Sequence, residues 1–106
     1  MGIAVLIPTK DEELNLPHAL ESVRGWASEV FVLDAGSSDG TKAVAERYGA
    51  TFVTHEWEGF ARQKNWGLGN LPFTSEWIFI LDADECVTGE LRDELLRVAD
   101  AADVRE

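Results

Sequence analysis

Two acidic side chains directly follow an apolar run late in the sequence. Asp82 and Asp84 come after Trp77–Leu81 (WIFIL), whose composition is typical of a strand buried on both faces. Alternate side chains of extended chain point to the same side, so the two carboxylates share one side if the strand geometry continues. Two hard oxygen ligands there can hold Mg²⁺ or Mn²⁺, whose open positions can take phosphate oxygens. The alternative is that Asp82 caps the next turn while Asp84 and Glu85 face solvent.

Small polar residues follow a second apolar run, Val30–Leu33. Asp34 can accept hydrogen bonds from a nucleoside, and Gly36 permits close backbone approach or a positive φ. The alternative is an ordinary turn between a strand and a helix. In either case Asp39 can satisfy free N–H groups at the start of that helix.

A third polar segment follows the run Ile3–Ile7, beginning at Pro8, which fixes the backbone at the strand end. Thr9 and Glu12 are candidates to face a ligand, and Lys10 is a candidate to contact a phosphate or to lie over a base. The alternative is a charged loop exposed to solvent.

The middle of the chain contains one clustered polar segment, residues 62–65, in which Lys64 can pair with a diphosphate or face solvent. Trp57 and Trp66 flank this segment; we expect them to pack in or near the core, or to line a sugar site. His18 and His55 lack any metal-ligand spacing, and we expect both at the surface.

Strand-like and helix-like segments alternate along the chain. The predicted strands are Ile3–Ile7, Val30–Leu33, Thr51–Thr54 and Trp77–Leu81. The predicted helices begin near Leu16, run from Thr41 to Tyr48, follow Thr88 and, with a weaker pattern, cover Phe60–Leu68. Repeated strand–helix units predict a Rossmann-like α/β fold with a mainly parallel sheet and flanking helices. Ligands of such sheets bind beyond the carboxyl ends of the strands, where the polar segments lie.

Composition narrows the class of protein. The 106 residues carry 20 acids and 9 bases, a formal charge of −11, which disfavours nucleic acid and anionic membranes as partners. The length fits one domain with its own core. Apolar runs are too short for a membrane span of about 20 residues. The single cysteine, Cys86, suits a reducing compartment, and we expect it to be a small buried filler.

Four segments occur in the order LIPTKDEELNLPHALESV, VFVLDAGSSDGT, GFARQKNWGL and WIFILDADE. Together they resemble the amino-terminal half of a family 2 glycosyltransferase of the bacterial lipopolysaccharide-core glucosyltransferase type, from Ile3 to about Leu96. The resemblance implies a GT-A fold, a nucleotide-diphosphate sugar donor, a divalent metal (Mg²⁺ or Mn²⁺), a glycan or glycolipid acceptor, and inversion at the anomeric carbon.

The resemblance also implies roles for residues that match its motifs. The implied donor-binding residues are Pro8, Thr9, Lys10, Glu12, Asp34, Gly36, Lys64, Asp82, Ala83 and Asp84, with Asp82 and Asp84 also holding the metal. Three positions depart from the family pattern. Ala35 replaces an acid that often contacts the base, Lys10 replaces an aromatic residue that packs on it, and Asp11 replaces an asparagine.

The resemblance finally implies an acceptor-binding half and a catalytic base that this chain does not offer. We therefore expect residues 1–106 to be one truncated donor-binding domain that does not transfer sugar alone and that self-associates through exposed apolar surface. The resemblance and the supply of nucleotide sugars place it in the cytoplasm, at the inner membrane face. Two other classes stay open at this point, a receiver-like phosphoacceptor domain and a non-catalytic binding module.

Overall fold

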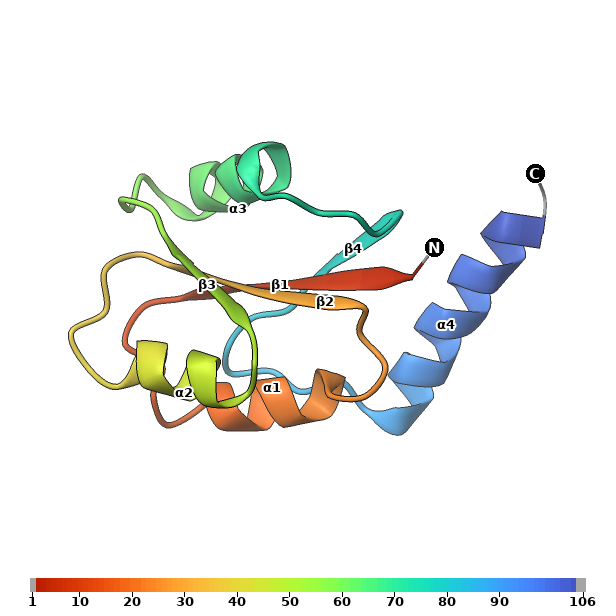
Figure 1. Ribbon diagram of the computed structural model, residues 1–106, viewed down its shortest axis with the longest axis horizontal. Helices are drawn as coiled ribbons and strands as arrows, with labels where there is room; N and C mark the ends of the chain where they lie inside the picture. The colour runs from red at the N-terminus through yellow and green to blue at the C-terminus, as the bar shows by residue number, and fades with distance from the viewer. Residues whose placement is uncertain (1, 105–106) are drawn as a thin grey trace.

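The computed structural model describes residues 2–104, within which eight elements alternate from strand to helix (Figure 1). The strands are β1 (Ile3–Thr9), β2 (Glu29–Asp34), β3 (Thr51–Thr54) and β4 (Trp77–Ile80). The helices are α1 (Leu16–Val23), α2 (Thr41–Arg47), α3 (Phe60–Asn70) and α4 (Gly89–Val104). The predicted parallel α/β fold is confirmed, and each predicted strand is present.

The four strands form one parallel sheet in the order β3-β2-β1-β4. Thr9 at the end of β1 lies opposite Asp34 at the end of β2, which in turn lies opposite Thr54 at the end of β3. The polar residues that end these strands therefore meet along one edge of the sheet, as expected for parallel pairing.

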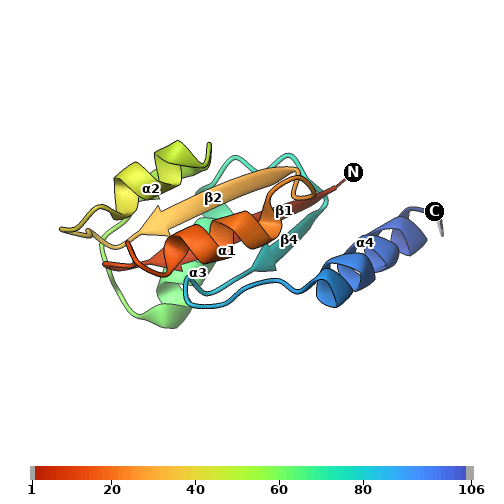
Figure 2. The same cartoon turned by 90° about the horizontal axis from the view of Figure 1, so that it is seen from below.

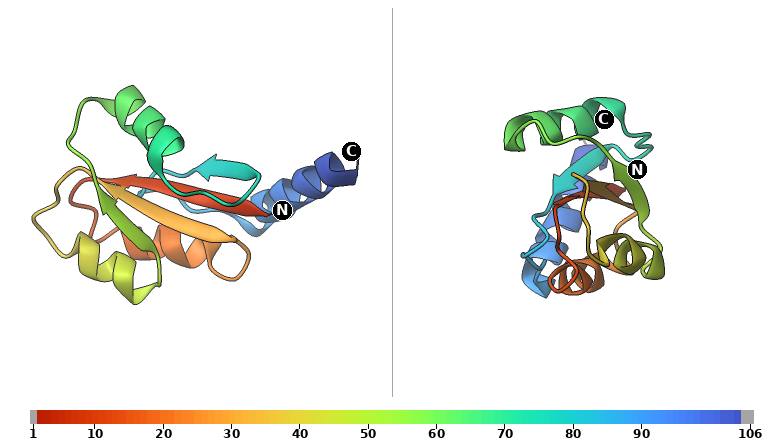
Figure 3. Two further views of the ribbon diagram at one scale, coloured as in Figure 1. Left: turned by 45° about the horizontal axis from the view of Figure 1, so that its top comes forward. Right: turned by 90° about the vertical axis from the view of Figure 1, so that its left-hand side faces the viewer.

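Helices cover both faces of the sheet, with α1 and α2 on one side and α3 on the other (Figures 1 and 3). Side chains of β1 alternate between the two layers because successive strand residues point to opposite faces. Val5 and Ile7 pack in the core formed with α1 and α2, whereas Leu6 packs with Phe31 and Leu33 in the core on the α3 side.

Helix α3 ends at Asn70, beyond the predicted end at Leu68, and its Gly67 lies against the sheet. A Cβ atom on Gly67 would lie 3.0 Å from Cδ2 of Leu33 and 3.1 Å from Cδ2 of Leu6. Glycine normally weakens a helix, but here it allows α3 to approach the sheet closely. Gly67, which weakened the prediction of a helix, is therefore the residue that lets α3 pack closely on the sheet.

Helix α4 projects from the body beside the start of β1, at the opposite end of the molecule from the carboxyl edge of the sheet (Figures 2 and 3). Its apolar residues Leu91 and Val98 are 38% and 45% exposed. Among residues 2–104, no helix combines the length and the apolar character needed to cross a membrane.

Candidate functional site

A cleft of about 740 Å³ opens at the carboxyl edge of the sheet. Its lining combines residues from the ends of β1, β2 and β4 with residues from the start of α3. The lining residues are Pro8, Thr9, Lys10, Glu12, Ala35, Trp57, Phe60, Gln63, Asp82, Ala83 and Asp84. Seven of the ten predicted donor-binding residues thus share one cleft; Asp34, Gly36 and Lys64 do not line it.

Asp82 and Asp84 lie on a turn rather than on an extension of β4. The strand ends at Ile80, and the turn is closed by the N–H of Glu85 donating to the carbonyl of Asp82 at 2.9 Å. Ala83 between them is 3% exposed and packs in the core, which leaves both carboxylates outside it. The strand geometry does not continue through Asp84, yet both carboxylates line the same cleft.

Lys64 of α3 reaches the edge of this acidic turn. Its Nζ lies 4.0 Å from Oδ1 of Asp82, and the two side chains are 35% and 56% exposed. An ion pair this exposed contributes only about 0–1 kcal/mol to stability. The ammonium group therefore stands beside the predicted metal-binding residues without being locked there.

The donor set of the turn suits a hard divalent cation that keeps open positions. Mg²⁺ is commonly held by one or two carboxylates, with phosphate oxygens and water completing its shell. Asp82 and Asp84 supply two such carboxylates, and across residues 2–104 no group of three or more His, Cys, Asp and Glu side chains is placed to hold a metal ion. The residues fit a cation shared with a bound phosphate, not a closed structural metal site.

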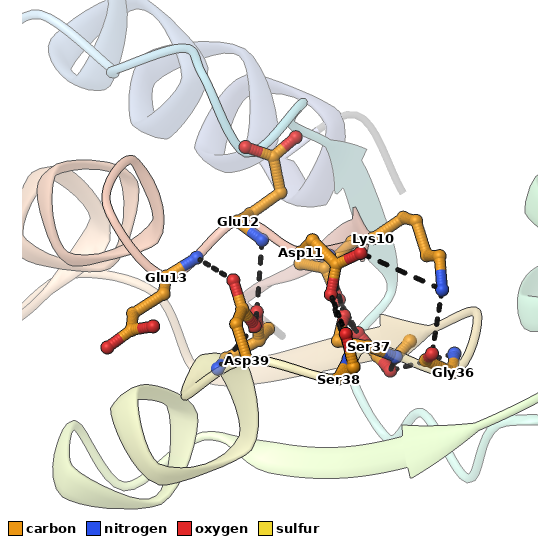
Figure 4. A network of polar contacts seen from close by, with 11 residues as sticks. Lys10, Asp11, Glu12, Glu13, Gly36, Ser37, Ser38 and Asp39 are labelled. Carbon is orange, nitrogen blue, oxygen red and sulfur yellow. Dashed lines mark hydrogen bonds and ion pairs between the residues drawn. The ribbon is translucent and has the colours of Figure 1, made fainter.

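The loops that follow β1 and β2 are joined by hydrogen bonds between side chains and backbone (Figure 4). The N–H of Asp11 donates to Oγ of Ser37 at 2.7 Å, and a carboxylate oxygen of Asp11 accepts from the N–H of Ser38 at 2.8 Å. The N–H of Glu12 donates to Oγ1 of Thr41 at 3.0 Å. Nζ of Lys10 also donates to the carbonyl of Gly36 at 2.7 Å. We call residues 10–13 and 36–41 together the braced loops.

The backbone of Asp11 explains the residue type at that position. Its φ is 53°, in the left-handed region where asparagine and aspartate are enriched among non-glycine residues. Aspartate at position 11 therefore suits this conformation and supplies a side-chain acceptor for the N–H of Ser38.

Asp39 lies one residue before Gly40, the N-cap of α2. Its carboxylate accepts from the N–H of Thr41 at 2.9 Å and from the hydroxyl of the same residue. The Thr41 hydroxyl is the main cause that lowers the pKa of Asp39 below its ordinary value. The predicted role in satisfying the free N–H groups at the helix start is confirmed.

Asp34 is 1% exposed, and its carboxylate accepts four hydrogen bonds from its own chain. One oxygen accepts from the hydroxyls of Thr9 and Ser37, each at 2.6 Å. The other accepts from the N–H groups of Gly36 at 2.9 Å and Ser37 at 2.6 Å. Burial raises the pKa of this carboxyl, but the hydrogen bonds from Ser37, Thr9 and Gly36 outweigh it and hold the pKa below its usual value.

Asp34 and Gly36 line a different hollow, of about 480 Å³, beside α2 and β3. Gly36 has a φ of 99°, so the predicted positive φ is present. The nucleoside-binding role of Asp34 stays a prediction, and its geometry gives it a second task, which is to hold the turn after β2 in shape.

Two aromatic residues, one just before α3 and one at its first position, line a part of the cleft that the sequence scarcely indicated. Trp57 and Phe60 are 45% and 74% exposed and pack edge to face with ring centroids 4.9 Å apart. Gln63 is buried and also lines the cleft. Aromatic residues usually signal a core, so only the polar cluster beside them offered a hint that Trp57 lines the cleft.

Two further predictions from sequence have clear outcomes. His18 is exposed, as expected, but His55 is half-buried and stacks on Trp66 with ring centroids 4.0 Å apart. Cys86 is exposed, so the prediction of a buried filler was wrong. It lies just beyond the acidic turn, where Val87 occupies the buried position instead.

The parallel sheet with helices on both faces places the chain among the α/β proteins that bind ligands at the carboxyl edge. More particularly, the sequence profile described as Glycosyl transferase family 2 matches residues 4–104, and the chain belongs to that family. An uncharacterized glycosyltransferase of Rickettsia conorii is 37% identical over 93 residues, which cover 88% of this chain and 32% of the relative. The lipopolysaccharide core biosynthesis glycosyltransferase LpsC of Rhizobium meliloti is 32% identical, covering 97% of this chain and 39% of LpsC. This chain therefore spans about a third of the length of these relatives.

Solved structures show the same fold. S. aureus TarS matches 95% of this chain and 33% of the solved chain, with a TM-score of 0.71 and 21% identity. Glucosyl-3-phosphoglycerate synthase from Mycobacterium tuberculosis, solved with Mn²⁺, uridine diphosphate and glucosyl-3-phosphoglycerate, matches 77% of this chain and 33% of its own, with a TM-score of 0.66 and 24% identity. The GT-A fold is thereby confirmed, and the receiver-like alternative is not favoured.

Proposed function

We propose that this chain is the donor-binding part of an inverting glycosyltransferase and that its cleft binds a nucleotide-diphosphate sugar. The observation that carries the proposal is the meeting of Asp82, Asp84 and Lys64 at the carboxyl edge of the sheet. Two carboxylates suit a divalent cation, and a lysine beside them suits the negative charge of a diphosphate. The mycobacterial structure with Mn²⁺ and uridine diphosphate supports this choice of ligand.

The exposed pair between Lys64 and Asp82 is easily exchanged. Because such a pair contributes only about 0–1 kcal/mol, Lys64 can leave Asp82 for a phosphate oxygen at little cost. The cation, when bound, neutralises the diphosphate and stabilises it as a leaving group. Asp82 and Asp84 hold it, while Lys64 orients the phosphates and the exposed rings of Trp57 and Phe60 cover the ligand.

Donor binding, not turnover, is the activity we assign to residues 1–106, taken as one nucleotide-sugar-binding unit. An inverting transfer needs a general base beside the acceptor hydroxyl. The acids that line the cleft are Glu12, Asp82 and Asp84; Glu12 accepts a hydrogen bond from Asn15 at 3.2 Å, and the other two form the proposed cation site. We assign no catalytic base among them.

The acceptor we propose is a cell-envelope glycan or glycolipid, such as a lipopolysaccharide core, with the name of LpsC as its support. The supply of nucleotide sugars favours a cytoplasmic position at the inner membrane face. We also propose self-association through the exposed apolar residues of α4, which light scattering over a range of concentrations would detect as an increase in mass.

Calorimetry with uridine diphosphate, with and without Mn²⁺, tests donor binding. We expect binding that requires the metal and that weakens at least tenfold in Asp82→Ala and in Asp84→Ala. Asp100→Ala, an exposed acid on α4, removes the same charge far from the cleft and should bind like the parent chain. Binding that ignores the metal, or that survives both substitutions in the turn, would refute the proposal.

A further inference from the structure

His55 lies next to the cleft at the far end of the carboxyl edge from the acidic turn. It follows β3 directly, and its N–H donates to the carbonyl of Asp34 at 2.9 Å, which places it beside Ala35. Ala35 lines both the cleft and a small hollow of about 150 Å³ whose other lining residues are Gly36, Thr54, His55 and Glu56. Adjacent strands are about 4.8 Å apart, so β3 and β4 are separated by roughly 14 Å along this edge.

The buried side chain of Gln63 fixes which nitrogen of His55 carries the hydrogen. The carbonyl oxygen of His55 can only accept, so the Gln63 atom 3.3 Å from it is the amide nitrogen. The amide oxygen of Gln63 then faces Nδ1 of His55 at 3.1 Å and accepts from it. In the neutral ring Nδ1 is therefore the donor, and Nε2 is left as an acceptor.

The accepting atom of His55 is open to a ligand. No hydrogen bond joins Nε2 to any residue in the range 2–104, and no buried side-chain nitrogen or oxygen in that range lacks a partner, so Nε2 is reached by solvent. Trp66 covers one face of the ring with the two planes 25° apart. The imidazole is thus held by Gln63 and Trp66 and presents one in-plane acceptor.

We propose that His55 is a specificity-determining residue that reads the base of the nucleotide donor through Nε2, an inference that rests on the proposed function. A ligand whose diphosphate lies at Asp82 and whose base lies past Ala35 meets this acceptor, while the methyl side chain of Ala35 offers no polar group of its own. The acceptor matches bases with a ring N–H on the pairing edge, such as uracil, thymine and guanine. Cytosine and adenine place a lone pair at that position, which Nε2 repels.

Three ligands, only one of which carries a ring N–H on the pairing edge, test this proposal without any substitution. With Mn²⁺ present, we expect uridine diphosphate to bind about tenfold more tightly than either cytidine diphosphate or N3-methyluridine diphosphate, because only the first donates a ring N–H. In nitrogen NMR, the Nε2 resonance of His55 should shift with uridine diphosphate and stay in place with the methylated ligand.

His55→Asn supplies the matched variant. Its amide nitrogen can replace Nδ1 as donor to Gln63, but it places no acceptor where Nε2 stands. We expect the affinity for uridine diphosphate to fall to that for cytidine diphosphate. The affinity for cytidine diphosphate and the Tm should stay unchanged. A merely structural role of His55 would weaken all three ligands together.

The remaining outcomes separate a failure of the role of His55 from a failure of donor binding. Equal binding of the three ligands to the parent chain, or discrimination that survives in His55→Asn, overturns the role of His55 and leaves donor binding intact. Absence of metal-dependent binding by all three ligands refutes the proposed function itself, and the role of His55 with it.

Discussion

Replacement of Asp34 removes the acceptor that closes the turn after β2. In Asp34→Ala the hydroxyls of Thr9 and Ser37 can rotate toward other acceptors, but the N–H groups of Gly36 and Ser37 are fixed by the backbone. Gly36 is exposed and Ser37 is half-buried, so water can partly replace the carboxylate, and each N–H that loses this charged acceptor costs about 1–2 kcal/mol. With two such groups and the lost hydroxyl bonds, we expect a loss of about 2–4 kcal/mol, a large part of the 5–15 kcal/mol typical of a domain.

Asp34→Asn should lose less stability than Asp34→Ala, because one carboxylate oxygen accepts only from hydroxyls and the other accepts only from N–H groups. The oxygen that accepts two N–H groups can be replaced by the amide oxygen. The oxygen that accepts two hydroxyls can be replaced by the amide nitrogen, since hydroxyls rotate to accept. Neutral hydrogen bonds are weaker than charged ones, so we expect a loss of about 1–2 kcal/mol.

Urea unfolding of the parent chain and both variants across pH measures these effects. The pKa of Asp34 is lower in the folded chain than in the unfolded chain. Its stabilisation is therefore fully present above the unfolded pKa of about 4 and is lost as pH falls through the folded pKa. The difference between the parent and Asp34→Asn should shrink over this acidic range, while the other carboxyls cancel in the comparison.

Two results would refute this reasoning. One is an Asp34→Ala protein within about 1 kcal/mol of the parent at about pH 7, which would mean that the N–H groups find other partners. The other is a gap between the parent and Asp34→Asn that stays constant as pH falls to about 3, which would mean that the carboxylate charge adds nothing.

Three further predictions follow from single contacts. Gly69→Ala should stabilise α3 by about 0.5–1 kcal/mol, since no atom lies within 4 Å of the added Cβ, whereas Gly67→Ala should give no gain or a loss. Urea unfolding measures both variants, and equal midpoints would contradict the close packing of α3 on the sheet. The free energy of unfolding of Asp11→Asn should lie within about 0.5 kcal/mol of the parent value, whereas that of Asp11→Ala should be about 1–2 kcal/mol lower because alanine is strained at this positive φ. Glu29→Ala should speed hydrogen exchange at the N–H groups of Thr74 and Ser75, which donate to Glu29 at 2.9 Å; unchanged protection would show that other contacts hold this loop.

The strands and their polar ends could be predicted because apolar content and spacing carry that information. A run such as Ile3–Ile7 buries both faces in a parallel sheet, and a polar stop after it marks the carboxyl edge. The pairing of β1 with both β2 and β4 then brings most of the predicted residues to one cleft.

Tertiary contacts decided the features that sequence could not give. The turn at Asp82 depends on Ala83 packing into the core, and a D-x-D string alone does not reveal that. The four partners of Asp34 come from three other residues, one of them 25 positions away. Trp57 and Phe60 are exposed because of the course of the backbone at the start of α3, and their residue types alone would equally suit a buried position.

The braced loops have a consequence for anyone who alters this edge of the molecule. Because backbone groups of one segment are satisfied by side chains of the other, neither segment keeps its shape if its counterpart is redesigned. The two segments of the braced loops therefore act as one structural unit. A combinatorial library aimed at new ligands must vary both segments together or leave both unchanged.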